Sequence, residues 1–410
     1  MPLSLRQRLV RIAVVAVPFG LYGWAILVAT GIGHNGQIGP GYNAVGQDWM
    51  IFWTAGHAWW SGQVAHIYDQ VWLTRTMDAA FRPLMNDPMP FPGFHYPPTF
   101  LLFLVPFAGL PMAWGFAASQ LASFAGMVAG LRRAFAEKAH VQVAAASLLL
   151  APAASNNVLS GQNGFLVCAL FLAGFPLLEA QPLAAGLWLG LASFKPQICL
   201  MIPFALLGAR NWRAMAGVAA SAAGLALLSL IVFGPEVWQT WLGLMLHPRQ
   251  DVAYTGVDWG RLWDDSVFTC AQTLGAGKSL ANLCQAAATL AAGAAVYASF
   301  RRPLSADLRF TIFLTASVVG SPHVSPYDMI LTALAATLLV VRSFEAPFSP
   351  LGLAIPMLAW LIPLIAPPRV TPMGLAAPAV MFALMAAAFF SGDRRPDRGS
   401  PSRSPRLSAA

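Results

Sequence analysis

The chain has 410 residues, of which 57% are hydrophobic and only 10% are charged. Because ordinary globular domains carry about 25% charged residues, this composition excludes a soluble fold. A membrane-spanning helix needs about 20 apolar residues, and this composition can furnish roughly ten to twelve such helices. The net charge of +8 does not indicate a nucleic-acid partner, because charges in a membrane protein report which side each loop faces. The sequence therefore predicts an all-α polytopic membrane protein.

The first apolar stretch, at about 12–31, is too long for the apolar part of a signal peptide, so we expect a spanning helix. An odd number of crossings would put the basic terminal segments on opposite sides, against the positive-inside rule. The stretch 97–109 is short and contains Pro106, so we expect it to be re-entrant or interfacial. This leaves about twelve transmembrane helices, within a range of roughly ten to thirteen. The later apolar stretches lie at about 97–109, 112–131, 141–157, 164–178, 182–194, 196–208, 212–233, 281–300, 308–321, 327–342, 349–366 and 372–391.

This arrangement makes residues 1–391 one membrane domain and puts most of the 24 Lys and Arg residues, with both termini, in the cytoplasm. Two large extracytoplasmic loops follow, 32–96 and 234–280, and the first has helix-like pieces at about 49–61 and 70–82. Residues 392–410 are rich in Ser, Pro and Arg, so we expect a disordered cytoplasmic tail beside anionic membrane lipids. One ambiguity concerns 182–208. If it is a single helix kinked at Pro196 instead of two short helices, 97–109 crosses after all.

Lys195 is an isolated charge in a long apolar stretch. An ammonium group in hydrocarbon costs about 2.5 to 3.5 kcal/mol, so it needs an anion or an exit to water. One interpretation is that Lys195 reaches the outer membrane interface. The other is that it is the counter-ion of a phosphate or carboxylate held at the membrane surface.

Asp48 opens an aromatic segment soon after the first apolar stretch. Its carboxylate can cap the helix expected at 49–61, because Asp accepts hydrogen bonds from backbone N–H groups at helix starts. It can also serve as a general base at the outer membrane surface, where partial loss of water raises a carboxyl pKa. The two roles are compatible.

Polar breaks interrupt the apolar stretches at FHYPP (94–98), SGQNG (160–164) and SPHVSPYD (321–328). Irregular backbone at membrane depth is tolerated only beside protein or a water-filled cavity, so the breaks together predict a cavity that opens outward. His323 and Asp328 are candidate acid–base or hydroxyl-binding groups, although a lone His is more often structural.

The second outer loop carries acidic residues beside tryptophans, which suits either sugar recognition or a solvated acidic loop. Its flanking cysteines, Cys270 and Cys284, can pair if the loop faces an oxidising compartment. The aspartates of this loop are Asp251, Asp258, Asp264 and Asp265.

The order of these motifs resembles glycosyltransferase family 87, the bacterial polyprenyl-phosphate-mannose-dependent mannosyltransferases with the GT-C fold. The resemblance covers about residues 45–330. It rests on an Asp after the first helix, a YPP element, a GQN break, a Lys-Pro pair and a late Ser-Pro to Tyr-Asp segment. These are Asp48, Tyr96-Pro97-Pro98, Gly161-Gln162-Asn163, Lys195-Pro196, and Ser321-Pro322 through Tyr327-Asp328.

The resemblance implies transfer of mannose or a related sugar from a polyprenyl-phosphate donor to a glycolipid or glycan hydroxyl, with inversion, on the periplasmic side of the inner membrane. By analogy Asp48 is the base, His323 assists it, and Lys195 binds the donor phosphate. Tyr96, Gln162, Tyr327 and Asp328 are then substrate-binding residues.

No cofactor is obligatory in this interpretation, and a divalent cation is possible but not implied. Relatives of this fold often carry an acidic pair where this chain has Asp48-Trp49, which leaves metal use open. The competing hypothesis is a transporter or flippase of lipid-linked sugars, which also has broken helices and an intramembrane charge.

Overall fold

The structure, a computed structural model, describes residues 13, 16–25, 45–81, 93–246, 264–343, 350–365 and 372–391. These residues form α-helices and short 3-10 helices without any strand, as the composition predicts. The predicted tail 392–410, both ends of the first apolar stretch, and Asp251 and Asp258 lie outside the described residues.

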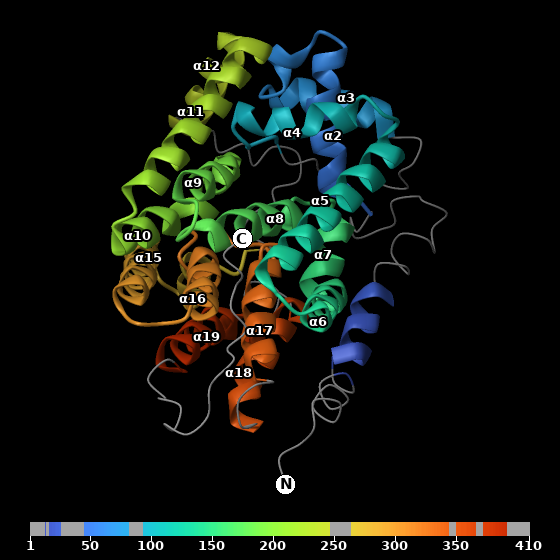
Figure 1. Cartoon of the computed structure of the whole chain (residues 1–410). Coiled ribbons are helices and arrows are strands. Elements are labelled where there is room, and N and C mark those ends of the chain that lie inside the picture. The colour runs from blue at the N-terminus through green and yellow to red at the C-terminus, as the bar shows by residue number, and fades with distance from the viewer. Residues whose placement is uncertain are drawn as a thin grey trace.

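One end of the molecule is formed by short helices from the two segments predicted to be outer loops and from the stretch 97–109, which follows the first of them (Figure 1). Two of them occupy the pieces expected to be helical at 49–61 and 70–82. A third, from the second loop, was not expected, and it exposes Leu242, Met245 and Leu246. The helices at this end are α2 (Gln47–Trp60), α3 (Gln70–Phe81), α4 (Leu101–Ala108) and α12 (Pro235–Leu246).

The middle layer contains α9 and α11, which pack closely because glycines face each other. A Cβ atom on Gly186 would lie 2.0 Å from the Ala214 carbonyl oxygen, and one on Gly217 would lie 2.4 Å from that of Leu183. Small residues allow such close approach between membrane helices. The helices of this layer are α5 (Met112–Ala134), α8 (Gly164–Gly174), α9 (Pro182–Leu191), α10 (Met201–Ala209) and α11 (Trp212–Phe233).

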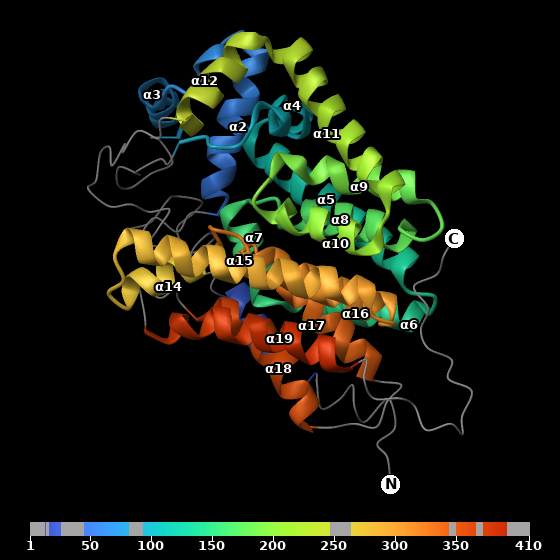
Figure 2. The same cartoon turned by 90° about the vertical axis from the view of Figure 1, so that its left-hand side faces the viewer.

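The remaining helices form the opposite part of the molecule, and α16 and α17 are its core (Figure 2). Most residues of α16 and α17 are buried. The stretch predicted at 141–157 is divided at Ala151 into α6 (Lys138–Leu150) and α7 (Pro152–Ser160). The other helices are α14 (Val267–Thr273), α15 (Lys278–Arg301), α16 (Ala306–Val319), α17 (Ile330–Ser343), α18 (Pro350–Leu361) and α19 (Ala377–Ser391).

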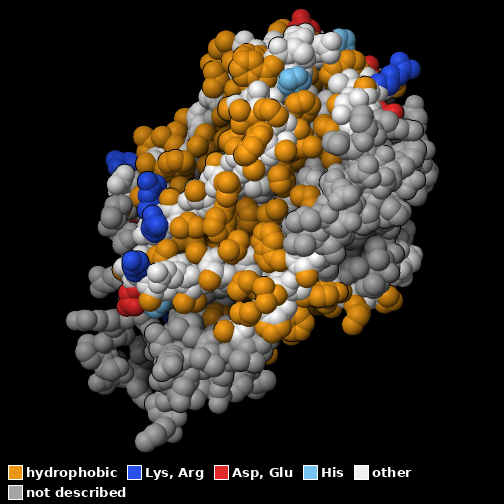
Figure 3. Space-filling view, turned by 90° about the vertical axis from the view of Figure 1, so that its right-hand side faces the viewer, with side chains coloured by type: hydrophobic (Ala, Val, Ile, Leu, Met, Phe, Trp, Pro, Cys, Tyr) orange, Lys and Arg blue, Asp and Glu red, His pale blue; other side chains and the backbone are white. Residues whose placement is uncertain are grey.

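Three described helices are long and apolar enough to cross a membrane, and the number rises to five if each of two bent pairs is one span. The unbent spans are 212–233, 278–301 and 372–391. One bent pair joins 98–108 to 112–134 at 115°, a geometry that fits either a broken span or a re-entrant loop. Hydrophobic side chains cover a broad face of the molecule (Figure 3). The chain is thus a helical membrane protein, and the number of twelve crossings stays a prediction.

The ambiguous segment 182–208 is a pair of short helices in this structure. Helix α9 continues into a 3-10 turn at Ala192–Phe194, the chain breaks at Lys195-Pro196, and a second 3-10 turn at Ile198–Leu200 leads into α10. The break puts Lys195 at the junction of two helices, where its side chain can reach residues from other parts of the chain.

Candidate functional site

Asp48 lies in the first turn of α2, close to the end of α7. The N-cap of α2 is Gly46, whose φ of 78° is left-handed, and no side chain caps this end of the helix. The Gly46 N–H donates to the Leu159 carbonyl over 2.6 Å, which joins the two helix ends. The helix-cap interpretation of Asp48 is therefore wrong. Its carboxylate instead accepts a hydrogen bond of 2.8 Å from Gln162 Nε2.

Gly161 makes this approach possible. It ends α7 with a φ of 76°, a backbone conformation that residues other than glycine rarely adopt. A Cβ atom at this position would lie 2.5 Å from Trp49 Cβ. Gly161 thus lets the chain turn directly under α2 and places Gln162 and Asn163 inside the protein.

A chain of hydrogen bonds runs from Asp48 through side-chain amides to Lys195. The Tyr96 hydroxyl donates to Gln162 Oε1 over 3.2 Å and accepts from Asn163 Nδ2 over 2.9 Å. Asn163 Oδ1 in turn accepts from Lys195 Nζ over 3.2 Å. Four motifs that are far apart in the sequence therefore meet in one polar network.

Lys195 finds its anion inside the protein. It is 2% exposed and forms an ion pair and a hydrogen bond with Asp328, which is itself 3% exposed. Its ammonium group also lies 5.2 Å from the centre of the Tyr327 ring, a cation–π distance. The interpretation that Lys195 reaches the outer interface is therefore wrong, because the Asp328 carboxylate compensates the charge where it is buried.

His323 lies on the same loop as Tyr327 and Asp328 and is more exposed, with 43% of its side chain accessible. Its Nδ1 is 3.5 Å from Asp264 Oδ2, and its Nε2 is 3.3 Å from Ser325 Oγ. The Ser325 N–H donates to Asp328 over 3.2 Å. His323 therefore connects to the Lys195–Asp328 pair through one serine.

The two acidic residues at the end of the second loop are buried, which corrects the expectation of a solvated loop. Asp264 is 3% exposed and Asp265 is 2% exposed. The Asp265 N–H donates to the Val324 carbonyl over 2.7 Å, and the Val324 N–H donates to Asp264 over 2.9 Å. These bonds hold the end of the second loop against the His323 loop.

Loss of water raises the pKa of Asp48 to about 6, partly opposed by the hydrogen bond from Gln162 and the charge of Lys195. Asp48 lies outside the candidate membrane spans. A carboxyl group with this pKa is ionised in most molecules at neutral pH and is a stronger base than an ordinary aspartate. The group at this position can accept a proton from a bound hydroxyl.

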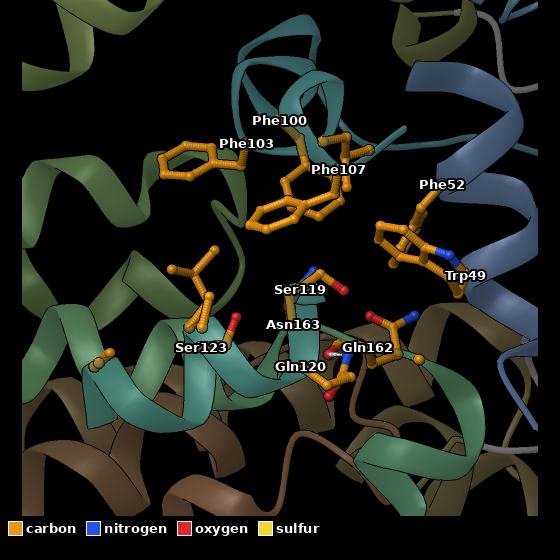
Figure 4. A pocket seen from close by; sticks show the side chains of 16 residues that line it. Trp49, Phe52, Phe100, Phe103, Phe107, Ser119, Gln120, Ser123, Gln162 and Asn163 are labelled. Atoms are coloured by element: carbon orange, nitrogen blue, oxygen red, sulfur yellow. Dashed lines mark hydrogen bonds between the residues drawn. The ribbon is translucent and has the colours of Figure 1, made fainter. Parts of the chain in front are cut away.

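A pocket of about 170 Å³ adjoins the network on the side of Gln162 and Asn163. Phe100, Phe103 and Phe107 of the 98–108 segment face Ser119 and Ser123 of α5 across it, and Trp49 and Phe52 of α2 lie at one end (Figure 4). The pocket is thus apolar along its length and carries amides where it meets the polar network.

All seven predicted site residues lie in this region. Asp48, Tyr96, Gln162, Lys195 and Asp328 share the hydrogen-bonded network, whereas Tyr327 joins it through its ring and His323 through Ser325.

Sequence reasoning missed Gln120, which donates to the Gln162 carbonyl over 3.0 Å. It also gave no role to Asn163, although the GQN motif contains it, and it missed the contact of Asp264 with His323. A glutamine in the middle of an apolar helix was the available signal for Gln120.

Two further expectations concern metals and thiols. Among the described residues, no group of three or more His, Cys, Asp or Glu side chains could hold a metal ion. This observation does not test the use of a divalent cation, which stays a prediction. Cys270 and Cys284 are free thiols in this structure.

The fold and the site define a helical membrane protein in which a buried network of acid–base groups and amides lies beside an apolar pocket. The family model of glycosyltransferase family 87 matches residues 94–326, more than half of the chain. The chain belongs to glycosyltransferase family 87 and is a membrane glycosyltransferase. The match includes Tyr96, Gln162, Lys195 and His323 but not Asp48, Tyr327 or Asp328. No curated protein and no solved structure matches the chain.

Proposed function

We propose that this glycosyltransferase transfers mannose or a related sugar from a polyprenyl-phosphate donor to a hydroxyl group of a glycolipid or glycan. The observation that carries the proposal is the hydrogen-bonded network from Asp48 to the Lys195–Asp328 pair beside an apolar pocket. It combines a base, hydroxyl-binding amides, a cation and an apolar surface, which are the groups that such a reaction needs.

The aromatic pocket supports a lipid-linked donor. Phenylalanine and tryptophan side chains offer the apolar contact surface that an isoprenoid chain requires. Its volume of about 170 Å³ is below the roughly 300 to 1,000 Å³ of complete ligand pockets, so we assign it only the part of the chain nearest the phosphate. The rest of the lipid would remain in the membrane.

In the proposed reaction the acceptor hydroxyl attacks the anomeric carbon while Asp48 takes its proton. The new bond joins the acceptor oxygen to this carbon, and the bond from the carbon to the phosphate oxygen breaks with both electrons leaving on the phosphate. One direct displacement inverts the anomeric centre. A positioned base contributes about 10² to 10⁴ in rate.

The leaving lipid phosphate gains a second negative charge, which the site must stabilise. In the proposal the Lys195 ammonium group contributes to this, although Asp328 already balances its full charge. Gln162, Tyr96 and Tyr327 bind sugar hydroxyls or phosphate oxygens. The reaction needs no redox group, and a divalent cation would be an addition to these residues.

The test is turnover of radiolabelled polyprenyl-phosphate mannose by membranes that contain the chain, with total lipid extract and host glycans as acceptors. We expect donor-dependent transfer that is lost at least about 100-fold in Asp48→Asn, because asparagine cannot accept the proton. With Asp48 as base, wild-type activity should rise with pH through about 6, since the pKa of this group is about 6 and only its ionised form is basic.

Asp69→Asn is the matched control. Asp69 is an exposed carboxylate of the same loop that caps α3 through the N–H groups of Val71 and Trp72, and asparagine keeps that acceptor. We expect it to retain activity. Transfer that survives Asp48→Asn would remove Asp48 as base, and movement of intact donor across proteoliposomes without sugar transfer would favour a flippase.

A further inference from the structure

Asp264 is a buried carboxylate with an unusually complete set of hydrogen-bond donors. It accepts from the Ser266 N–H over 2.9 Å and from the Ser266 hydroxyl over 3.0 Å. Thr269 Oγ1 donates to it over 2.8 Å, and the Val324 N–H over 2.9 Å. These bonds fix the carboxylate in place from both α14 and the His323 loop.

Besides these hydrogen bonds, Asp264 Oδ2 lies 3.5 Å from His323 Nδ1. A carboxylate behind one ring nitrogen fixes the orientation of an imidazole and favours its protonated form. The other nitrogen, Nε2, then faces Ser325 Oγ at 3.3 Å, on the side that leads to Asp328 and Lys195.

A protonated His323 would supply a positive charge that the Lys195–Asp328 pair does not supply. Lys195 is paired with Asp328, so the charges of these two groups cancel. His323 is the more exposed cation candidate of this region, with 43% of its side chain accessible. A phosphate that gains charge as it leaves would find its additional positive partner there.

We propose that Asp264 is a positioning residue that orients His323 and keeps it positively charged toward the phosphate of the lipid-linked donor. This role of the charge rests on the proposed function. The orientation and protonation of the ring do not depend on the proposed function, and they can be measured without turnover.

The other charged groups near His323 act in both directions. Loss of water around the ring lowers the pKa of His323, and the charge of Lys195 lowers it further. The hydrogen bond and charge of Asp264, together with the charge of Asp328, outweigh both effects, so the pKa is raised. His95 lies in the first loop, and its pKa is lowered first by burial and then by repulsion from His323. Asp265, whose pKa is raised to about 8 by loss of water and by Asp264, is largely neutral at pH 7.

The experiment measures the ionisation of His323 by its reaction with diethyl pyrocarbonate, which acylates neutral imidazole, at a series of pH values in the purified full chain. Peptide mass spectrometry follows His323 among the seven histidines, and His323→Gln gives the blank. In the wild type we expect the midpoint above the ordinary histidine value of about 6.5. In Asp264→Asn we expect it to fall by at least about one pH unit, because the amide keeps an acceptor oxygen but loses the charge.

Asp264→Glu, which keeps the charge, should restore most of the shift. Equal midpoints in the wild type and Asp264→Asn would overturn the proposal. If Asp264→Asn does not fold, a wild-type midpoint at or below about 6.5 overturns it equally.

Donor turnover supplies a separate readout. The alkaline limb of the wild-type pH profile should move to lower pH in Asp264→Asn, and Asp264→Asn should have no further effect in a His323→Gln background. A multiplicative loss in that double variant would show that Asp264 acts independently of His323. If the donor is not used at all, the proposed function fails, while the acylation experiment still decides the assignment of Asp264.

Discussion

At the scale of single residues, the Lys195–Asp328 pair determines what a substitution can reveal. Both groups are almost completely buried, so removing one leaves an uncompensated charge inside the protein. Breaking such a pair costs about 3 to 5 kcal/mol, whereas replacing both members by apolar residues is often neutral. Loss of activity in a single Lys195 variant would therefore confuse catalysis with stability.

We predict that Lys195→Met and Asp328→Leu each lower the thermal unfolding temperature in detergent, and that the double variant recovers most of the loss. Transfer from the lipid-linked donor should nevertheless stay abolished in the double variant, because the cation is gone. Unfolding measured by fluorescence and donor turnover on the same preparations separate the two effects. A double variant with wild-type turnover would remove Lys195 from the phosphate site.

The sequence identifies the residues of this site better than it identifies their partners. Lys195 stands out because a lone charge in an apolar stretch demands compensation, and Gly161-Gln162 stands out because it interrupts two apolar runs. That Asp328 is the compensating anion depends on how helices far apart in the sequence pack, which no local pattern encodes. For the same reason Asp264 looked like one of several loop acids, although it is buried against His323.

At the scale of helices, the close packing of α9 on α11 positions the site, because α9 leads directly to Lys195. A Cβ atom on Gly186 would lie 2.0 Å from backbone oxygen, where neither helix can yield without moving. In α11 itself, Gly224 has nothing within 4 Å of its would-be Cβ. The pair offers a comparison of the same substitution in tight and open surroundings.

We predict that Gly186→Ala destabilises the protein by about 1 to 3 kcal/mol, the usual cost of overpacking, and lowers transfer activity by displacing α9. Gly224→Ala should leave both unchanged or raise stability slightly, because alanine favours helix. Thermal unfolding and donor turnover check both variants. Equal stability of the two would show that α9 and α11 separate easily and that their contact does not hold Lys195.

Helix positions were predictable where apolar runs are long, as in α11 and α15, whose bounds differ little from the stretches seen in the sequence. The bends were not. Pro106 indicates a weak helix at 97–109, but α4 packs against both α2 and α5, and its 115° angle to α5 cannot be derived from hydropathy. The 58° break at Ala151 likewise precedes a proline, which permits a bend without dictating its angle.

At the scale of the whole molecule, the basic turns indicate which end faces the cytoplasm. The turns that join α5 to α6, α10 to α11 and α15 to α16 lie on one side of the molecule, whereas α3 and α12 lie at the opposite end (Figure 2). These turns and the helix ends beside them carry Arg132, Arg133 and Lys138, then Arg210 and Arg213, then Arg301, Arg302 and Arg309. Lys and Arg accumulate in cytoplasmic loops, so we propose that α2, α3, α12 and the site near Asp48 face the periplasm.

Two single cysteines test this orientation with a membrane-impermeant maleimide on intact spheroplasts. Ser61→Cys follows α2 and Ala136→Cys lies in the turn between α5 and α6, and both positions are exposed. We expect Ser61→Cys to be labelled from outside and Ala136→Cys only after permeabilisation, with the unsubstituted chain as the blank for its four cysteines. The opposite labelling would turn the site toward the cytoplasm. Nucleotide sugars are made on the cytoplasmic face, so an enzyme whose site lies there would not require a lipid-linked donor.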